Sequence, residues 1–203
     1  MEKFGDLGFR KHKAMAKLWG LLTVRLASQA VLPFSAKPYA ESLKKGFSSL
    51  GFSNRINYRK LGQAIDRFSD KAARLDKDAE AIRGRLDADK NYNDSLLIDN
   101  INARYMSIEK AFLNEEGLPQ RRWYKHMVCC ICPFLKERDI MKWSTNNPFL
   151  QAFGPGLWEG YGGVVFPAIA DALLLHDSAL IQEAVDATTK AIKKVTKLMG
   201  TKI

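Results

Sequence analysis

The hydrophobic positions between residues 58 and 87 repeat with the period of a long α-helix. They fall at alternating spacings of four and three residues, which places them along one face of the helix. These positions are Leu61, Ile65, Phe68, Ala72, Leu75, Ala79, Ile82 and Leu86. The opposite face is rich in charged residues, so we predict an amphipathic helix whose apolar seam packs against other helices. Because no other segment has a seam of equal length, the pattern favours a bundle core over a coiled coil.

Three more helices are expected before residue 114, over residues 9–31, 36–48 and 94–113. The first is apolar around much of its circumference, which is typical of a helix at the centre of a bundle. Pro33 should end it, because proline disfavours helical geometry in the residue before it. Ser35 has the side chain of a good N-cap for the second helix.

The helical period disappears between residues 114 and 165 and returns at Pro167. Glycine and proline interrupt this segment and aromatic residues interleave with them, so we expect a long loop that is packed rather than disordered. Two final helices are predicted over residues 167–175 and 178–199. The predicted fold is all-α: a four-helix-bundle-like single domain over residues 1–203, with a long structured loop.

Composition adds few constraints to this fold. A chain of 203 residues that is 46% hydrophobic can bury a core without a metal or a disulfide. Cys129, Cys130 and Cys132 are poorly spaced for a disulfide or a zinc site, so we interpret them as part of an apolar run. No basic and apolar leader follows Met1, and polar residues interrupt the apolar stretch 18–34, so we expect a soluble chain.

The formal net charge of +10 is the first candidate for a functional signal. Basic proteins attract nucleic acid and anionic membranes through their field alone. The basic residues here are spread along the whole chain, and no nucleic-acid-binding module accompanies them. We therefore expect most of them to lie on solvated helix faces, and we retain a basic nucleic-acid- or membrane-binding module only as an alternative.

No catalytic motif is present in the sequence. His12, His126 and His176 are far apart, and none has a glutamate three positions before it, as the di-iron bundles require. The sequence has no His-Glu-x-x-His, P-loop, Gly-x-Ser-x-Gly or dinucleotide fingerprint. The residues thus predict a helical bundle without a catalytic centre or a metal site of its own.

A series of short motifs nevertheless resembles a known family. The chain resembles the C-terminal helical domain of the transferrin receptor and glutamate carboxypeptidase II (N-acetylated alpha-linked acidic dipeptidase) family from about Phe9 to Leu198. The motifs, in the order of that family, are Phe9-Arg10-Lys11-His12, Val31-Leu32-Pro33-Phe34, Glu109-Lys110-Ala111-Phe112, Gly117-Leu118-Pro119, Trp123-Tyr124-Lys125-His126 and Phe166 to Leu173.

This resemblance implies a dimerisation domain, a bundle that pairs two subunits and packs against a protease-like domain. In that family the two zinc ions and the catalytic glutamate belong to the protease-like domain, which precedes this region. We therefore expect this chain to bind no zinc or other cofactor and to hydrolyse no peptide alone. Family members are typically single-pass membrane proteins with this domain on the extracytoplasmic side, so any membrane anchor would lie upstream; localisation stays unknown.

One loop of the carboxypeptidases sends a lysine and a tyrosine into the substrate pocket. The resemblance matches that tyrosine to Tyr161, whereas Gly160 stands at the lysine position. The ammonium group that could pair with a substrate carboxylate is therefore missing. A full-length relative of this chain should not share the acidic C-terminal preference.

The leading hypothesis is an interaction domain that forms a homodimer and supports a peptidase-like domain. An alternative is a fragment of a zinc carboxypeptidase or aminopeptidase that contributes loop residues to an active site after docking. The candidate core and dimer residues are Phe68, Leu75, Ile82, Phe166, Pro167, Ile169 and Leu173. Obligate homodimers commonly bury about 2,000 Å² or more, so a large apolar surface is expected.

Overall fold

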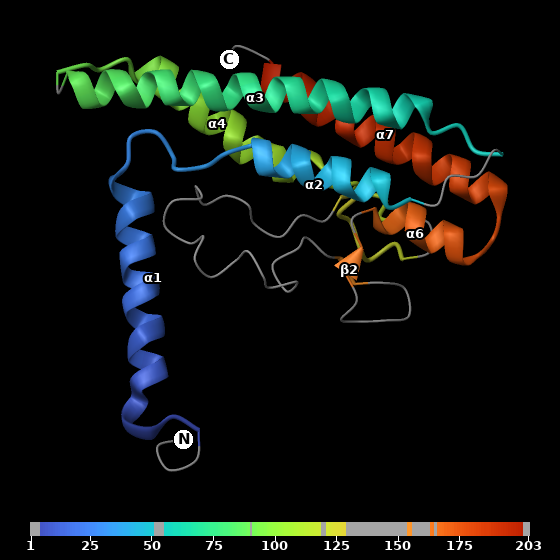
Figure 1. The fold of residues 1–203 in the computed structure, drawn as a ribbon, viewed down its shortest axis with the longest axis horizontal. Coiled ribbons are helices and arrows are strands. Elements are labelled where there is room, and N and C mark those ends of the chain that lie inside the picture. Colours follow the sequence, from blue (N-terminus) through green and yellow to red (C-terminus); the bar gives the residue numbers. More distant parts are fainter. Residues whose placement is uncertain are drawn as a thin grey trace.

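The computed structural model describes residues 5–50, 55–89, 91–118, 121–128, 154–155, 163–164 and 166–200. Helices dominate this part of the chain (Figure 1). The helices are α1 (Arg10–Ser28), α2 (Lys37–Ser48), α3 (Arg59–Ala88), α4 (Ser95–Ala111), α6 (Pro167–Leu174) and α7 (Ser178–Gly200), with a short 3-10 turn, η1 (Leu7–Phe9), before α1. The prediction of an all-α fold is confirmed. The described strands, β1 (Gly154–Pro155) and β2 (Gly163–Val164), form one short antiparallel pair.

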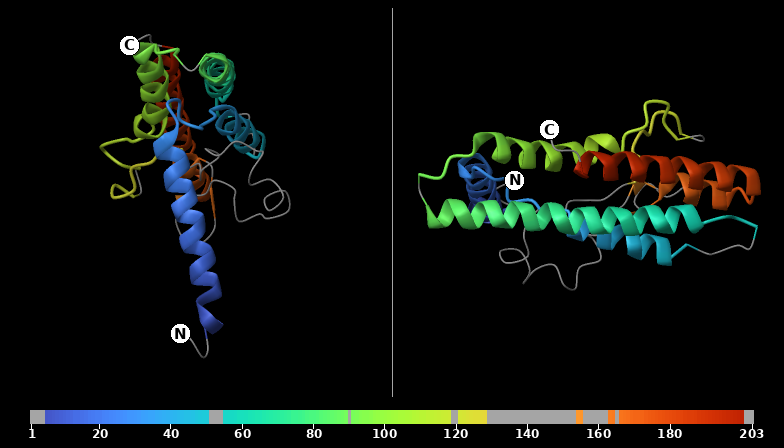
Figure 2. Two further views of the ribbon diagram at one scale, coloured as in Figure 1. Left: turned by 90° about the vertical axis from the view of Figure 1, so that its left-hand side faces the viewer. Right: turned by 90° about the horizontal axis from the view of Figure 1, so that it is seen from above.

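The bundle is organised around α3 and α7. These two helices run side by side in the same direction, since the Asn57 N–H before α3 donates to Gln182 Oε1 early in α7 at 2.9 Å, and Gly200 at the end of α7 lies beside Lys71. α2 packs against α3, and α4 and α6 pack against α7 (Figure 1). The two further views in Figure 2 show the same arrangement from the end and from above.

Aromatic rings fill the centre of the bundle. The Phe68 ring contacts two others, with centroid distances of 5.8 Å to Tyr39 of α2 and 6.1 Å to Phe112 after α4. Tyr39 and Phe112 are themselves stacked, at 5.3 Å and an interplanar angle of 6°. All three side chains are fully buried, so this cluster joins α2, α3 and α4 at one point.

Aspartate side chains cap the starts of α4 and α7, and α2 is capped from another helix. Asp94 caps α4 by accepting from the Leu97 N–H at 3.1 Å, and Asp177 caps α7 by accepting from the Ala179 N–H at 2.8 Å. The prediction that Ser35 caps α2 is wrong, because the Ser35 hydroxyl donates instead to Asp76 of α3 at 2.7 Å. Asp76 also accepts from the Ala36 N–H at 2.7 Å, so a carboxylate from another helix caps α2.

The prediction that the first helix is central is also wrong. α1 ends at Ser28, contains no buried residue, and projects away from the bundle as an arm (Figures 1 and 2). Its apolar residues were read as a core surface because a broad apolar face normally packs within the same domain. In this structure that face is exposed, with Leu21 at 72%, Trp19 at 67% and Val24 at 64% exposure.

Candidate interaction surface

The predicted residues of α3 lie inside the subunit. Phe68 and Leu75 are fully buried and Ile82 is nearly so, all on the face that contacts the other helices of the bundle. Side chains in these positions stabilise the subunit itself. These side chains are buried within the subunit, so the structure does not expose them to a second subunit. Their role in a dimer interface stays a prediction.

The predicted residues of α6 occupy a similar position. Phe166, Pro167 and Ile169 are buried, and Leu173 is partly buried against the core. The exposed apolar residues of this helix come just after them, at Leu174. The α6 motif thus anchors the helix to the bundle, while its C-terminal end offers apolar surface to solvent.

A buried ion pair joins α6 to the loop after α4. Arg121 and Asp171 approach to 2.9 Å through Nη2 and through Nε of the guanidinium, and their side chains are only 5% and 3% exposed. Burial raises the pKa of the Asp171 carboxyl above its usual range, and the guanidinium beside it opposes that rise. The Arg121 guanidinium also lies 5.1 Å from the ring centroid of Tyr124, a cation–π arrangement.

The loop after α4 has a defined backbone in its described part. Met127 donates to the Phe112 carbonyl at 3.0 Å and Leu118 donates to the Tyr124 carbonyl at 3.0 Å, so the chain folds back on itself. Gly117 has φ +74°, and a Cβ there would lie 2.1 Å from the Arg122 carbonyl oxygen. This loop presents Trp123 to solvent with 73% of the side chain exposed.

The carboxypeptidase-like loop residues cannot be placed. Gly160 and Tyr161 lie outside the described residues, as do the three cysteines. Among the residues that the structure describes, no group of three or more His, Cys, Asp or Glu side chains is arranged to hold a metal ion. His126 contacts Glu109 at 2.8 Å, and His12 contacts Asp6 at 2.6 Å, so these two histidines each join a single carboxylate.

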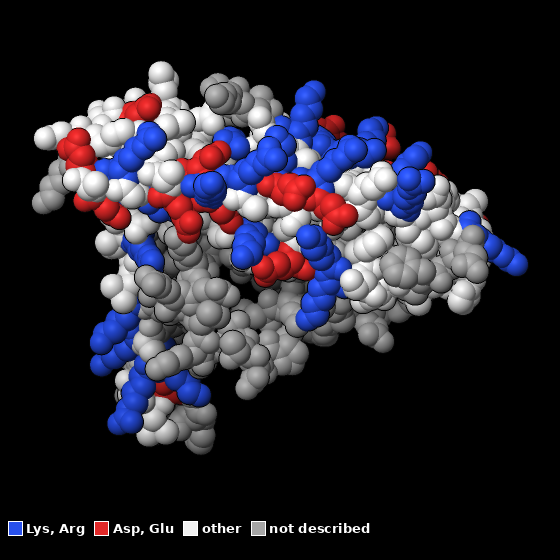
Figure 3. All heavy atoms as spheres, turned by 45° about the horizontal axis from the view of Figure 1, so that its top comes forward, with Lys and Arg blue, Asp and Glu red and all other residues white. Residues whose placement is uncertain are grey.

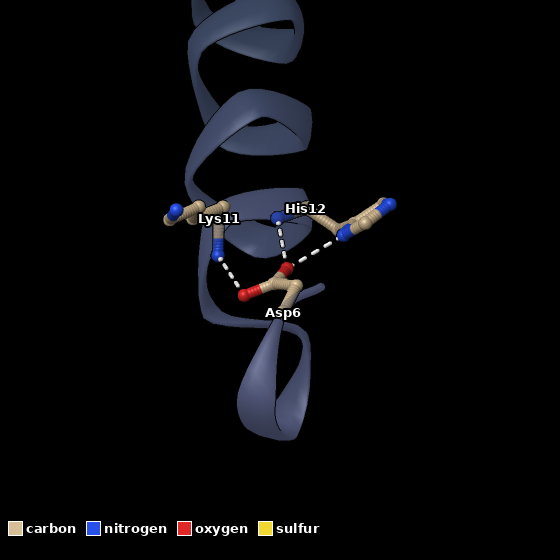
Figure 4. A network of polar contacts seen from close by, with 3 residues as sticks. All are labelled: Asp6, Lys11 and His12. Atoms are coloured by element: carbon tan, nitrogen blue, oxygen red, sulfur yellow. Dashed lines mark hydrogen bonds and ion pairs between the residues drawn. The ribbon is translucent and has the colours of Figure 1, made fainter. Parts of the chain in front are cut away.

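The largest accessible apolar feature of the described chain is α1. Its exposed hydrophobic side chains are Met15, Leu18, Trp19, Leu21 and Val24. The start of this helix is fixed by Asp6, whose carboxylate accepts from the Lys11 N–H at 3.0 Å and from the His12 N–H at 2.9 Å (Figure 4). These bonds satisfy amides that a helix start leaves without partners.

The segment between α1 and α2 is held to the bundle by polar contacts. Asn102 of α4 donates to the Ala30 carbonyl at 2.8 Å and accepts from the Leu32 N–H at 2.9 Å. Arg83 of α3 donates to the Leu32 carbonyl at 2.6 Å and to the Phe34 carbonyl at 3.3 Å. Because both sides of this segment are bonded, α1 leaves the bundle from an anchored base.

Sequence comparison places this fold in a known family. The model of the transferrin receptor-like dimerisation domain matches residues 56–144 and 151–200, which is more than half of the chain. The chain belongs to this family. The match begins after α2, so the projecting helix α1 lies outside the matched domain.

Curated relatives extend the similarity beyond the matched domain. The chain is 31% identical to the probable glutamate carboxypeptidase LAMP1 of Arabidopsis thaliana over 85% of its length, and 29% identical to aminopeptidase NAALADL1 of Rattus norvegicus over 79%. The inactive zinc metalloprotease C354.09c of Schizosaccharomyces pombe is 23% identical over 96% of the chain, so that alignment includes α1. The chain spans about a fifth of the length of these relatives.

The polar residues that organise this domain were not predicted from the sequence. In the sequence, Arg83 belongs to the charged face of the long helix and Arg121 is one of the basic residues spread along the chain, and no signal singles out Asp76. Their partners are backbone groups and side chains far away in the chain, which no local pattern reveals.

The described helices include none that is long and apolar enough to cross a membrane.

Proposed function

We propose that this chain is the non-catalytic dimerisation domain of a protein of the zinc-peptidase family, and that α1 is the element with which it packs against a peptidase-like domain. The membership in the dimerisation-domain family supports pairing of two bundles. The relatives with peptidase names are about four times as long as the chain, which supports a further domain in the functional protein.

The observation that carries the proposal is the exposure of α1. An arm with Trp19, Leu21 and Val24 on its surface is unfavourable in water unless another surface covers it. The arm precedes the residues of the dimerisation model, yet it aligns with a relative whose name is that of an inactive zinc metalloprotease. These two facts together favour a peptidase-like domain as the surface that covers α1.

The test is a titration of the chain with the peptidase-like domain of the Arabidopsis relative, followed by calorimetry. We expect binding, and we expect Leu21→Glu/Val24→Glu to weaken it by roughly tenfold or more, because buried apolar anchors dominate such interfaces. The matched control is Lys13→Gln/Lys17→Gln, which changes the net charge equally on exposed positions of the same helix. Equal binding by all three proteins would contradict the assignment of α1.

The same preparations test the absence of catalysis. We expect the chain alone to release no product from acidic dipeptides or aminoacyl substrates, and to lose added zinc on dialysis. Stoichiometric zinc that survives dialysis, or hydrolysis by the isolated chain, would contradict a non-catalytic domain.

A further inference from the structure

A groove with basic walls runs between α3 and α7 on the side where these helices lie next to each other. Arg67 and Lys71 of α3 form one wall, and Lys193 and Lys197 of α7 form the other. Its volume is about 440 Å³, and none of the described residues that line it is Asp or Glu. We call this the basic groove. Figure 3 shows Lys and Arg side chains standing along this edge of the bundle.

The charges in the basic groove are arranged against the usual preference of helices. Arg67 and Lys71 are four residues apart, as are Lys193 and Lys197, and like charges at this spacing destabilise a helix. Because α3 and α7 run in parallel, the two pairs face each other across the groove. Within the described part of the chain, Arg67, Lys71 and Lys193 make no ion pair with an acid.

The other lining residues leave room for a bound group. Ala64 contributes only a methyl group, and Gly200 contributes no side chain. A Cβ at Gly200 would lie 3.0 Å from the Lys71 Nζ, so glycine lets that ammonium group rest against the end of α7. The Thr196 hydroxyl donates to the Ile192 carbonyl at 2.7 Å. Among the described residues that line the groove, its lone pairs are then the only side-chain acceptor.

A ligand for such a groove must consist of acceptors and carry several negative charges. Lys and Arg side chains are donors only, and their strongest partners are phosphate and carboxylate oxygens. Arg67, Lys71 and Lys193 alone place three cations on two walls, which suits a group with more than one phosphate better than a single carboxylate. We propose that the basic groove binds an oligophosphate group, either as a free anion or as the headgroup of a lipid.

This site is separate from α1. The groove lies between α3 and α7 within the bundle, whereas α1 projects away from it. The dimerisation proposal is tested by the mass of the chain in solution, so failure of oligophosphate binding would not decide it.

The experiment is calorimetric titration of the full chain with tripolyphosphate, together with flotation of the chain with vesicles. One set of vesicles contains phosphatidylcholine alone, and the other also contains phosphatidylinositol 4,5-bisphosphate. The variant is Lys71→Gln/Lys193→Gln, which removes one cation from each wall. The control, Lys45→Gln/Lys110→Gln, makes the same charge change on exposed positions of α2 and α4.

We expect one tripolyphosphate per chain, and at least a roughly tenfold weaker affinity for the groove variant, because each charge-assisted hydrogen bond contributes this much. The control variant should bind as the original chain does. Binding to the bisphosphate vesicles without binding to tripolyphosphate would assign the groove to a lipid headgroup. Absence of both, or an equal loss in the two variants, would overturn the proposal, since only a general attraction to a basic protein would remain.

Discussion

At the scale of single residues, Asp76 connects three helices. Its carboxylate accepts from the Ser35 hydroxyl and the Ala36 N–H, both at 2.7 Å, and from the Lys37 N–H at 3.0 Å. The Tyr105 hydroxyl of α4 donates to the same group at 2.7 Å. Burial and the adjacent carboxylate both raise the pKa of Tyr105, so this phenol stays a donor over the whole working range.

We expect Asp76→Ala to destabilise the chain by about 2–4 kcal/mol, because a helix cap and a bond from a buried tyrosine are lost together. Urea denaturation measures this as a lower midpoint. Asp70→Ala is the matched control, since Asp70 is exposed on the same helix, and its effect should stay within about 0.5 kcal/mol. Equal midpoints for the two variants would show that Asp76 is not a structural centre.

Asp6 gives a prediction about pH. The pKa of its carboxyl falls from 3.8 to about 2, first because the Lys11 N–H donates to it, with the His12 contacts adding to the effect. A lowered pKa in the folded state stabilises the start of α1 fully above pH 3.8, and this contribution is lost as pH falls through about 2.

The amide proton shifts of Lys11 and His12 report this titration by NMR. We expect their midpoint near pH 2, and no such step in Asp6→Asn, where the ionisable group is gone. A midpoint at the ordinary value of 3.8 would mean that Asp6 does not hold the start of the helix.

At the scale of the elements, α3 carries the core. Phe68 is fully buried and contacts the rings of Tyr39 and Phe112, so Phe68→Ala should cost about 3–5 kcal/mol by leaving a cavity at the junction of three elements. The denaturation midpoint measures this loss. Leu96→Ala, at a position that is 83% exposed on α4, should change it little. An unchanged midpoint for Phe68→Ala would refute the assignment of the seam.

The helices of the bundle were predictable because each carries its own apolar period. The residues of α3 from Leu61 to Ile82 are buried as the seam predicts, and the bounds differ by one or two positions. The position of α1 was predicted wrongly because an apolar helix face has the same sequence pattern whether it packs within the domain or is exposed. The cap of α2 was missed because Asp76, which accepts the hydrogen bond from the Ala36 N–H, lies 40 positions away in the sequence.

At the scale of the whole molecule, the chain combines a closed core with an open arm. The residues predicted from the sequence to form the core and the dimer interface are mostly buried within one subunit. The exposed apolar surface lies at other positions, such as α1, Trp123 and Met106 of α4. The proposed docking of α1 uses a helix outside the matched dimerisation domain, so it can be tested separately from the proposed pairing of two bundles.

The most direct test of the central claim is the mass of the purified chain in solution, measured by light scattering over a dilution series. We expect twice the chain mass of 22.9 kDa, persisting on dilution, both in the original chain and in Leu21→Glu/Val24→Glu. A folded monomer at every concentration would contradict the assignment of this chain as a dimerisation domain.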